Sequence, residues 1–116
     1  MPLIKVQTSV AVPEPRREPL LTAASRLLSE ATGKPETYVM AVLEPATATC
    51  MGGAVTPAAF VDVRGIGGWN AKVNATVTQG LCALLAKELN IPGDGVYVTF
   101  TDVPAVNWGW NSRTFG

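Results

Sequence analysis

The sequence predicts an α+β fold built from two consecutive β-α-β units. Four stretches have the composition of strands and two have the apolar periodicity of helices, in the order strand, helix, strand, repeated once. The two halves also resemble each other, because Pro35 precedes Tyr38 after the first helix and Pro92 precedes Tyr97 after the second. Since a β-α-β unit is almost always right-handed, two copies predict a four-stranded mixed sheet with both helices on one face.

The first half begins with alternating and β-branched residues, which predict a strand over residues 3–10. Helical spacing of apolar residues follows over residues 16–32, and because proline is tolerated only near the first turn, we expect the regular helix to start close to Pro19. Gly33 is a C-terminal stop signal. The nearly continuous apolar run over residues 38–44 predicts a strand that is parallel to its neighbour or covered on both faces.

The second half repeats this pattern. Residues 58–64 predict a strand, Asn70 or a nearby residue opens a helix, and Asn90 lies where that helix should end. An alternating strand is expected over residues 96–101. The tail, residues 107–116, has two tryptophans in a loop-like context.

Length and composition limit the function classes. The 116 residues predict one domain spanning residues 1–116, and 47% apolar against 16% charged content predicts burial of apolar surface between subunits. Both predicted helices cover the same face of the sheet, so no helix of this chain remains for the opposite face. We therefore expect other subunits to cover that face. A formal net charge of zero provides no basic field for nucleic acid or for an anionic membrane surface, so we expect neither partner.

The chain contains no histidine, which removes imidazole bases and the commonest metal ligand. Cys50 and Cys82 form no CxxC pair, so neither a metal site nor a redox motif is expected. The run Gly65-Ile66-Gly67-Gly68 lacks the Lys-Ser/Thr of a P-loop and is too short for a dinucleotide fingerprint. We therefore expect no cofactor, and interpret this run as a tight turn whose amides can hold a carboxylate.

The sequence has no apolar run of membrane-spanning length and no secretory signal pattern at its start. We therefore expect a soluble, cytoplasmic chain.

Pro2 is the best catalytic candidate. Removal of Met1, which is usual before a small residue, would leave Pro2 with a free secondary amine at the head of an apolar strand. An α-amino group has a pKa of about 7.7–8.0, and burial or a neighbouring cation would lower it and make the amine a base near neutral pH. The alternative is that Pro2 only starts the strand.

The motifs together resemble the macrophage migration inhibitory factor family of the tautomerase superfamily, and the resemblance covers the whole chain as a bacterial or other homologue. It rests on the following segments: Met1-Pro2, Ala31-Thr32-Gly33-Lys34-Pro35, Gly52-Gly53, Gly65-Ile66-Gly67-Gly68 and the tail Asn107-Trp108-Gly109-Trp110-Asn111-Ser112-Arg113-Thr114-Phe115. It implies a homotrimer whose β-α-β units surround a central channel and whose active sites lie between subunits.

The resemblance also implies site residues. Pro2 matches the acid-base group, Lys34 the lysine that holds the substrate carboxylate and depresses the pKa of the proline, and Ile66 the residue whose backbone amide assists. Tyr97 matches a tyrosine that reaches the site from the neighbouring subunit. The aromatic wall residues of the pocket correspond to Trp110 and Phe115.

Three positions depart from the pattern. Thr99 stands where the family has an asparagine near the distal end of the substrate, and Trp108 replaces a smaller aliphatic residue beside the pocket. Ala58-Ala59-Phe60-Val61 occupies the place of a Cys-x-x-Cys segment, so thiol oxidoreductase activity is not expected.

We expect a cofactor-independent isomerase, a keto-enol tautomerase acting on phenylpyruvate-like aryl 2-oxo acids. The alternative is a cytokine-like signalling module that binds a protein receptor, with a vestigial or secondary tautomerase pocket. The family's cytokines leave cells without a signal peptide, so the resemblance leaves non-classical secretion open.

Overall fold

The sheet is formed by four strands: β1 (Leu3–Thr8), β2 (Met40–Glu44), β3 (Ala59–Gly65) and β4 (Val96–Asp102). In the computed structural model, which describes residues 1–116, their order is β2-β1-β3-β4. β1 and β2 are parallel, as are β3 and β4, whereas β1 and β3 pair antiparallel. The predicted pair of β-α-β units and the mixed sheet are therefore confirmed.

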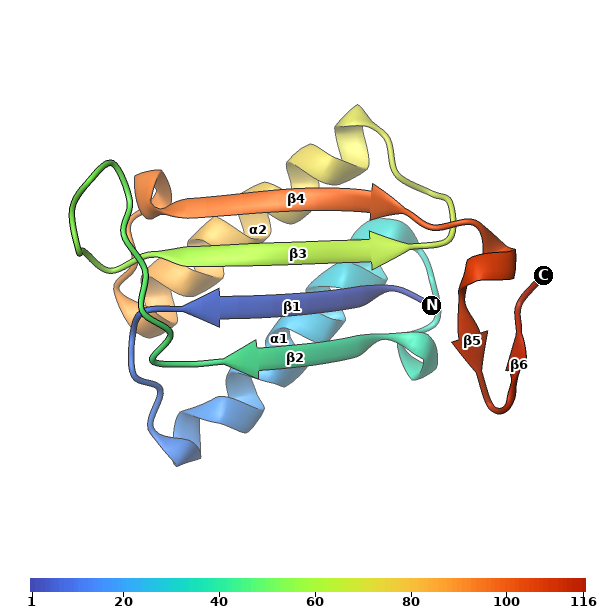
Figure 1. Cartoon of the computed structure of the whole chain (residues 1–116), viewed down its shortest axis with the longest axis horizontal. Coiled ribbons are helices and arrows are strands. Elements are labelled where there is room, and N and C mark those ends of the chain that lie inside the picture. The colour runs from blue at the N-terminus through green and yellow to red at the C-terminus, as the bar shows by residue number, and fades with distance from the viewer.

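Both helices, α1 (Glu14–Thr32) and α2 (Ala71–Leu89), lie on one face of the sheet (Figure 1). Alternate residues of β1 and β3 point toward them and are buried. The core between sheet and helices includes the buried residues Ile4, Val6, Leu20, Ala24, Leu28, Val61, Val63, Val77, Leu81 and Leu85. Their spacing is two in the strands and three to four in the helices, because these are the periods at which side chains of each element share a face.

The predicted ends of α2 and the end of α1 are confirmed by their caps. The side chain of Asn70 accepts a hydrogen bond from the Val73 N–H at 2.9 Å, which satisfies one of the free donors of the first turn. Asn90 ends α2 in the left-handed conformation with φ 55°, and Gly33 ends α1 with φ 71°.

The predicted start of α1 near Pro19 is wrong, because the helix begins at Glu14 and contains Pro19. Pro15 is the second residue of this helix, in the first turn, where a backbone N–H would have no partner within the helix. The Arg17 side chain ties this first turn to the preceding chain by donating to the Val12 carbonyl at 2.9 Å. The helix therefore begins five residues before Pro19, and the contact between Arg17 and Val12 stabilises its exposed first turn.

Two strands are shorter than predicted. β1 stops at Thr8, whose hydroxyl accepts the Val10 N–H at 3.1 Å and takes that donor out of the sheet ladder. Tyr38 lies in a short 3₁₀ helix (Glu36–Tyr38), so β2 starts only at Met40.

The tail is more ordered than the loop predicted from its composition. After a 3₁₀ turn (Ala105–Asn107) it forms a hairpin of β5 (Gly109–Trp110) and β6 (Arg113–Thr114). The two connecting residues, Asn111 and Ser112, have φ 50° and 68°, as a two-residue hairpin turn of right-handed strand twist requires. The hairpin stands beyond the end of the sheet where both termini lie (Figure 1).

The sheet face away from the helices is more polar than the apolar strands suggested. Lys5 pairs with Glu44 at 3.5 Å, and the Arg64 guanidinium contacts the Asp62 carboxylate at 2.8 Å. Large apolar side chains lie exposed mainly toward the ends of this face, such as Tyr97. Most apolar side chains of β1 and β3 therefore lie on the face of the sheet that packs against the helices.

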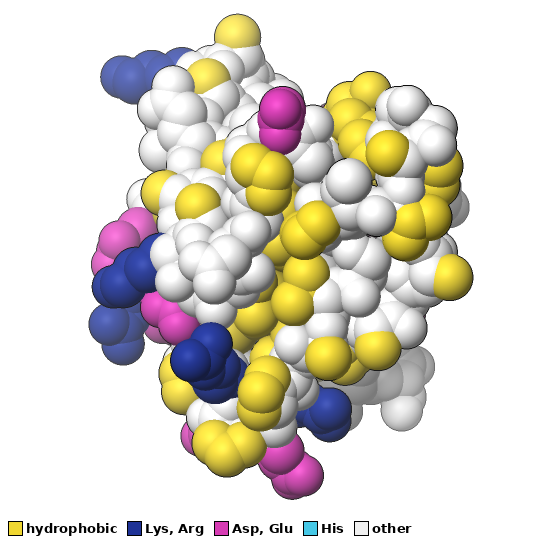
Figure 2. Space-filling view, turned by 90° about the vertical axis from the view of Figure 1, so that its left-hand side faces the viewer, with side chains coloured by type: hydrophobic (Ala, Val, Ile, Leu, Met, Phe, Trp, Pro, Cys, Tyr) yellow, Lys and Arg dark blue, Asp and Glu magenta, His cyan; other side chains and the backbone are white.

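Charges of both signs share the surface. At the end of the molecule remote from the termini, hydrophobic side chains run down the middle of the view, and basic and acidic groups gather together mainly at its left edge and at the bottom (Figure 2). Neither helix is both long and apolar enough to cross a membrane.

Candidate active site

The N-terminus is held at the end of the sheet. Pro2 directly precedes β1 and its side chain is fully buried, while its carbonyl accepts the Met40 N–H at 3.0 Å and continues the β1–β2 pairing. The terminal amine, on Met1, donates to the Tyr38 carbonyl at 2.6 Å. The burial of Pro2 and its bond with Met40 do not involve Met1, so they would hold the Pro2 amine at this end of the sheet if Met1 were removed.

Lys34 is placed by the end of α1. The left-handed Gly33 turns the chain, and the Ser29 hydroxyl donates to the Lys34 carbonyl at 2.6 Å. The Lys34 ammonium then reaches across to the turn after β3, where it donates to the carbonyls of Ile66 at 2.6 Å and of Gly67 at 2.8 Å. An ammonium has three N–H donors, so one remains for a ligand anion.

An aromatic side chain lies under this ammonium. The Nζ atom of Lys34 is 5.7 Å from the centroid of the Trp69 ring, a cation–π distance. Trp69 packs in turn on Phe100 of β4, with centroids 5.7 Å apart. A Cβ atom on Gly65 would lie 2.6 Å from the Trp69 ring, so only glycine leaves the indole its place.

The electrostatics of the two cationic groups are coupled. Burial, and then the positive charge of Lys34, lower the pKa of the terminal amine from its ordinary value of 8.0. Burial also lowers the pKa of Lys34, while the carboxylate of Asp102 acts in the opposite direction. An amine in this position is therefore neutral, and able to accept a proton, at a lower pH than an exposed one.

Aromatic rings gather beside the amine. Trp110 and Phe115 stack with centroids 5.9 Å apart, and both meet Tyr38 edge to face, at 5.6 and 6.5 Å. Trp110 remains 53% exposed, so the group presents an open apolar wall. The backbone carbonyl of Tyr38 also accepts the hydrogen bond of the Met1 amine, so Tyr38 links the ring cluster with the amino terminus.

Trp108 lies in a neighbouring cleft of about 270 Å³. The cleft is lined by Leu3, Arg64, Val103, Asn107, Trp108 and Gly109. The hydrogen bonds and charge of Asp62 raise the pKa of Arg64, which therefore stays cationic beside this cleft.

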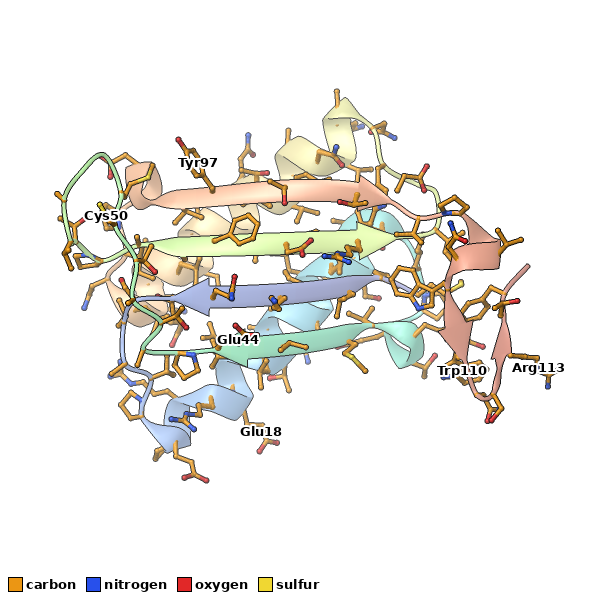
Figure 3. The ribbon with its side chains drawn as sticks, in the orientation of Figure 1. Glu18, Glu44, Cys50, Tyr97, Trp110 and Arg113 are labelled. Carbon is orange, nitrogen blue, oxygen red and sulfur yellow. The ribbon has the colours of Figure 1, made fainter.

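Tyr97 and Thr99 do not join these residues within one chain. Both are exposed on β4, and Tyr97 projects from the end of the sheet opposite to Trp110 (Figure 3). The contribution of Tyr97 to the site of a neighbouring subunit, and the substrate contact of Thr99, stay predictions.

Ile66 contributes its carbonyl to Lys34, and the assistance expected from its amide stays a prediction. Sequence reasoning missed Tyr38, Trp69 and Asp102. Tyr38 begins the apolar run that predicts a strand, and Trp69 stands between a glycine-rich turn and a helix cap, where the sequence gives no sign of its contact with Lys34. Asp102 directly follows an alternating strand, which is a position where polar groups often meet at a sheet edge. No three Cys, Asp or Glu side chains lie together as a metal site would need.

The fold and the site together define the class of protein. Two β-α-β units in a mixed sheet, with Pro2 at the head of β1, form the α+β tautomerase fold. A family model described as macrophage migration inhibitory factor matches residues 1–116. The chain therefore belongs to the macrophage migration inhibitory factor family.

Individual relatives agree with this assignment. The macrophage migration inhibitory factor of Xenopus laevis is 35% identical over 118 residues, covering 99% of each chain, and a homolog from Brugia malayi is 38% identical over 96 residues, covering 83% of this chain and 84% of the other. Among solved structures, a homologue from Prochlorococcus marinus has a TM-score of 0.93 at 38% identity, covering 98% of this chain and 99% of the other. The Toxoplasma gondii protein has a TM-score of 0.93 at 30% identity, covering 97% and 98%.

Proposed function

We propose that this protein is a cofactor-independent keto-enol tautomerase of phenylpyruvate-like aryl 2-oxo acids, with the amine of Pro2 as its acid-base group. The observation that carries the proposal is the geometry at this end of the sheet: Pro2 is buried at the head of β1, and the Lys34 ammonium has one N–H free. Burial and the charge of Lys34 lower the pKa of the Met1 amine, and we expect the same two causes to act on an amine on Pro2. Membership of the family supports it, and Pro2 and Lys34 lie in two of the segments on which the resemblance to that family rests.

The substrate fits the arrangement of groups. One N–H of the Lys34 ammonium is free to donate to the substrate carboxylate, and a charge-assisted bond of this kind is stronger than a neutral one. The open wall of Tyr38, Trp110 and Phe115 offers stacking surface for an aryl ring. The Ile66 amide is proposed to assist at the carboxylate.

The reaction needs one base that becomes one acid. The neutral Pro2 nitrogen takes a proton from the carbon next to the ketone, and the electron pair of the broken C–H bond forms the carbon–carbon double bond. The negative charge moves to the ketone oxygen, and the protonated Pro2 amine gives up its proton to that oxygen, directly or through solvent water, which forms the enol hydroxyl and restores the neutral amine. In the reverse direction the protonated amine returns its proton to carbon.

We also propose that the working unit is a homotrimer. Tyr97 and Thr99 are exposed on β4, which β3 separates from β1, and they pair in register with Phe60 and Asp62 rather than with the end of β3 nearest Pro2. We therefore expect them to serve the site from a neighbouring subunit. The bulky side chain of Trp108 is proposed to narrow the mouth of the active-site pocket. Light scattering measures the oligomeric state, and a monomer that turns over phenylpyruvate would contradict this arrangement.

The function is tested by intact mass and phenylpyruvate ketonisation on the same preparation. We expect a mass that lacks methionine and a kcat/KM that falls as pH drops through the lowered pKa of the amine. Pro2→Gly, processed and folded, should lose much of the rate because its amine is less restricted.

The matched control inserts one alanine between Met1 and Pro2. Removal of methionine then leaves an amine one residue away, while the Pro2 nitrogen becomes an amide without basicity. The loss should be about 10²–10⁴-fold, the contribution of a general base. Full activity in both variants would exclude Pro2 as the base, and a processed wild type without turnover would favour the receptor-binding alternative.

A further inference from the structure

The turn that holds Lys34 is itself held by an acidic side chain at the end of β4. The Asp102 carboxylate accepts a hydrogen bond from the Gly67 N–H at 2.8 Å. Asp102 pairs in register with Gly65, and the Val103 N–H donates to the Gly65 carbonyl at 2.8 Å. The carboxylate is therefore anchored to the end of the sheet from which the turn starts.

The same peptide group connects Asp102 with Lys34. The carbonyl of Ile66 and the N–H of Gly67 belong to one peptide unit, which accepts from the Lys34 ammonium at 2.6 Å and donates to Asp102 at 2.8 Å. The unit thus lies between a negative and a positive charge, and each bond strengthens the other by polarising it. Gly67 has φ 67°, a conformation that glycine adopts without strain, so the backbone alone does not fix this orientation.

We propose that Asp102 is a positioning residue of the tautomerase site, which orients the Ile66–Gly67 peptide group and thereby fixes the place and the charge of the Lys34 ammonium. This inference rests on the proposed function of Lys34. Asp102 acts through the turn, because its observed hydrogen bond goes to the turn backbone.

The charge of Asp102 has a second effect. Lys34 is partly buried, and this burial lowers its pKa. The carboxylate of Asp102 opposes this lowering. The positive charge of Lys34 in turn lowers the pKa of the terminal amine. Asp102 thus favours the protonated form of Lys34, and the positive charge of Lys34 favours the neutral form of the amine, which is the combination that the reaction requires.

The test compares Asp102→Asn with Asp102→Ala. Asparagine keeps an oxygen that can accept the Gly67 N–H but removes the charge, whereas alanine removes both. Asp94→Asn is the matched control, because Asp94 is an exposed aspartate that lies just before the first residue of β4, whereas Asp102 is its last residue. The measurements are the titration of Lys34 by NMR on ¹³C-labelled lysine side chains, the KM and kcat for phenylpyruvate, and unfolding in urea.

We expect both Asp102 variants to lower the pKa of Lys34, and Asp102→Ala to raise KM about tenfold with little change in kcat, as for loss of a well-placed charged donor. Asp94→Asn should change neither. Lost stability with an unchanged Lys34 titration and KM would show a purely structural role and overturn the inference. The titration does not depend on turnover, so it decides the inference even if the wild-type protein proves inactive as a tautomerase.

Discussion

Replacement of Lys34 by methionine tests the site most directly. Methionine keeps much of the length of the side chain but removes the charge and all three donors. Two of these donors bind the carbonyls of Ile66 and Gly67 at 2.6 and 2.8 Å, so the third is the one available to a substrate carboxylate.

The size of the effect follows from that one bond. A hydrogen bond to a charged group contributes about 1.5–3 kcal/mol, and about 1.4 kcal/mol corresponds to a tenfold change in rate. Lys34 is half-buried and partly screened by solvent, so the lower part of this range applies. We expect kcat/KM for phenylpyruvate to fall about tenfold to thirtyfold.

The variant should also change the pH dependence. The charge of Lys34 is one of the two causes that lower the pKa of the terminal amine, after burial. Its removal raises that pKa, so the amine becomes neutral only at higher pH and the acid limb of kcat/KM moves upward. Burial remains, so the limb should stay below the position for an exposed amine.

The assay compares phenylpyruvate with its methyl ester in wild-type protein, Lys34→Met and the exposed control Lys72→Met. The ester has no carboxylate, so Lys34→Met should slow it much less than the acid at a pH where the amine is neutral. Equal slowing of both substrates, or an acid limb that does not move, would refute the assignment of Lys34 as the group that binds the carboxylate and tunes the amine. Lys72→Met should behave like the wild type.

Three further predictions concern stability. Leu81→Ala should lower the free energy of unfolding by about 2–5 kcal/mol in urea, because the side chain is fully buried; a cost below about 1 kcal/mol would mean that the core collapses around the cavity. Asn70→Ala should cost about 1 kcal/mol by removing the bond to the Val73 N–H, and Asn70→Asp should restore most of it. Gly65→Ala should displace Trp69, cost about 1–3 kcal/mol and shift tryptophan fluorescence; an unchanged spectrum would show that the indole does not depend on the missing Cβ.

The sequence alone was sufficient where neighbours in the chain decide the structure. Apolar periods placed the helices and strands, and the caps at Asn70, Asn90 and Gly33 end or begin helices where predicted, because each cap satisfies backbone groups within a few residues. The start of α1 is not visible in the sequence, because Pro19 favours a helix that begins close to it, whereas the contact of Arg17 with the Val12 carbonyl belongs to the folded chain. The ion pairs on the sheet face away from the helices could not be predicted either. The contact between Lys5 and Glu44 depends on how β1 and β2 pair, which the sequence of one strand does not show.

The candidate residues Pro2 and Lys34 could be named from the sequence, through the family motifs that contain them. Tertiary structure decided what surrounds them. The ammonium of Lys34 meets the carbonyl of Ile66, 32 residues away, and that peptide group meets Asp102, 35 residues further along the chain from its Gly67 nitrogen. Such contacts depend on where the ends of β3, β4 and α1 converge, which is set by packing of the whole core. Local sequence determines the elements, and the pKa of a group follows from the burial and charges that only the assembled fold provides.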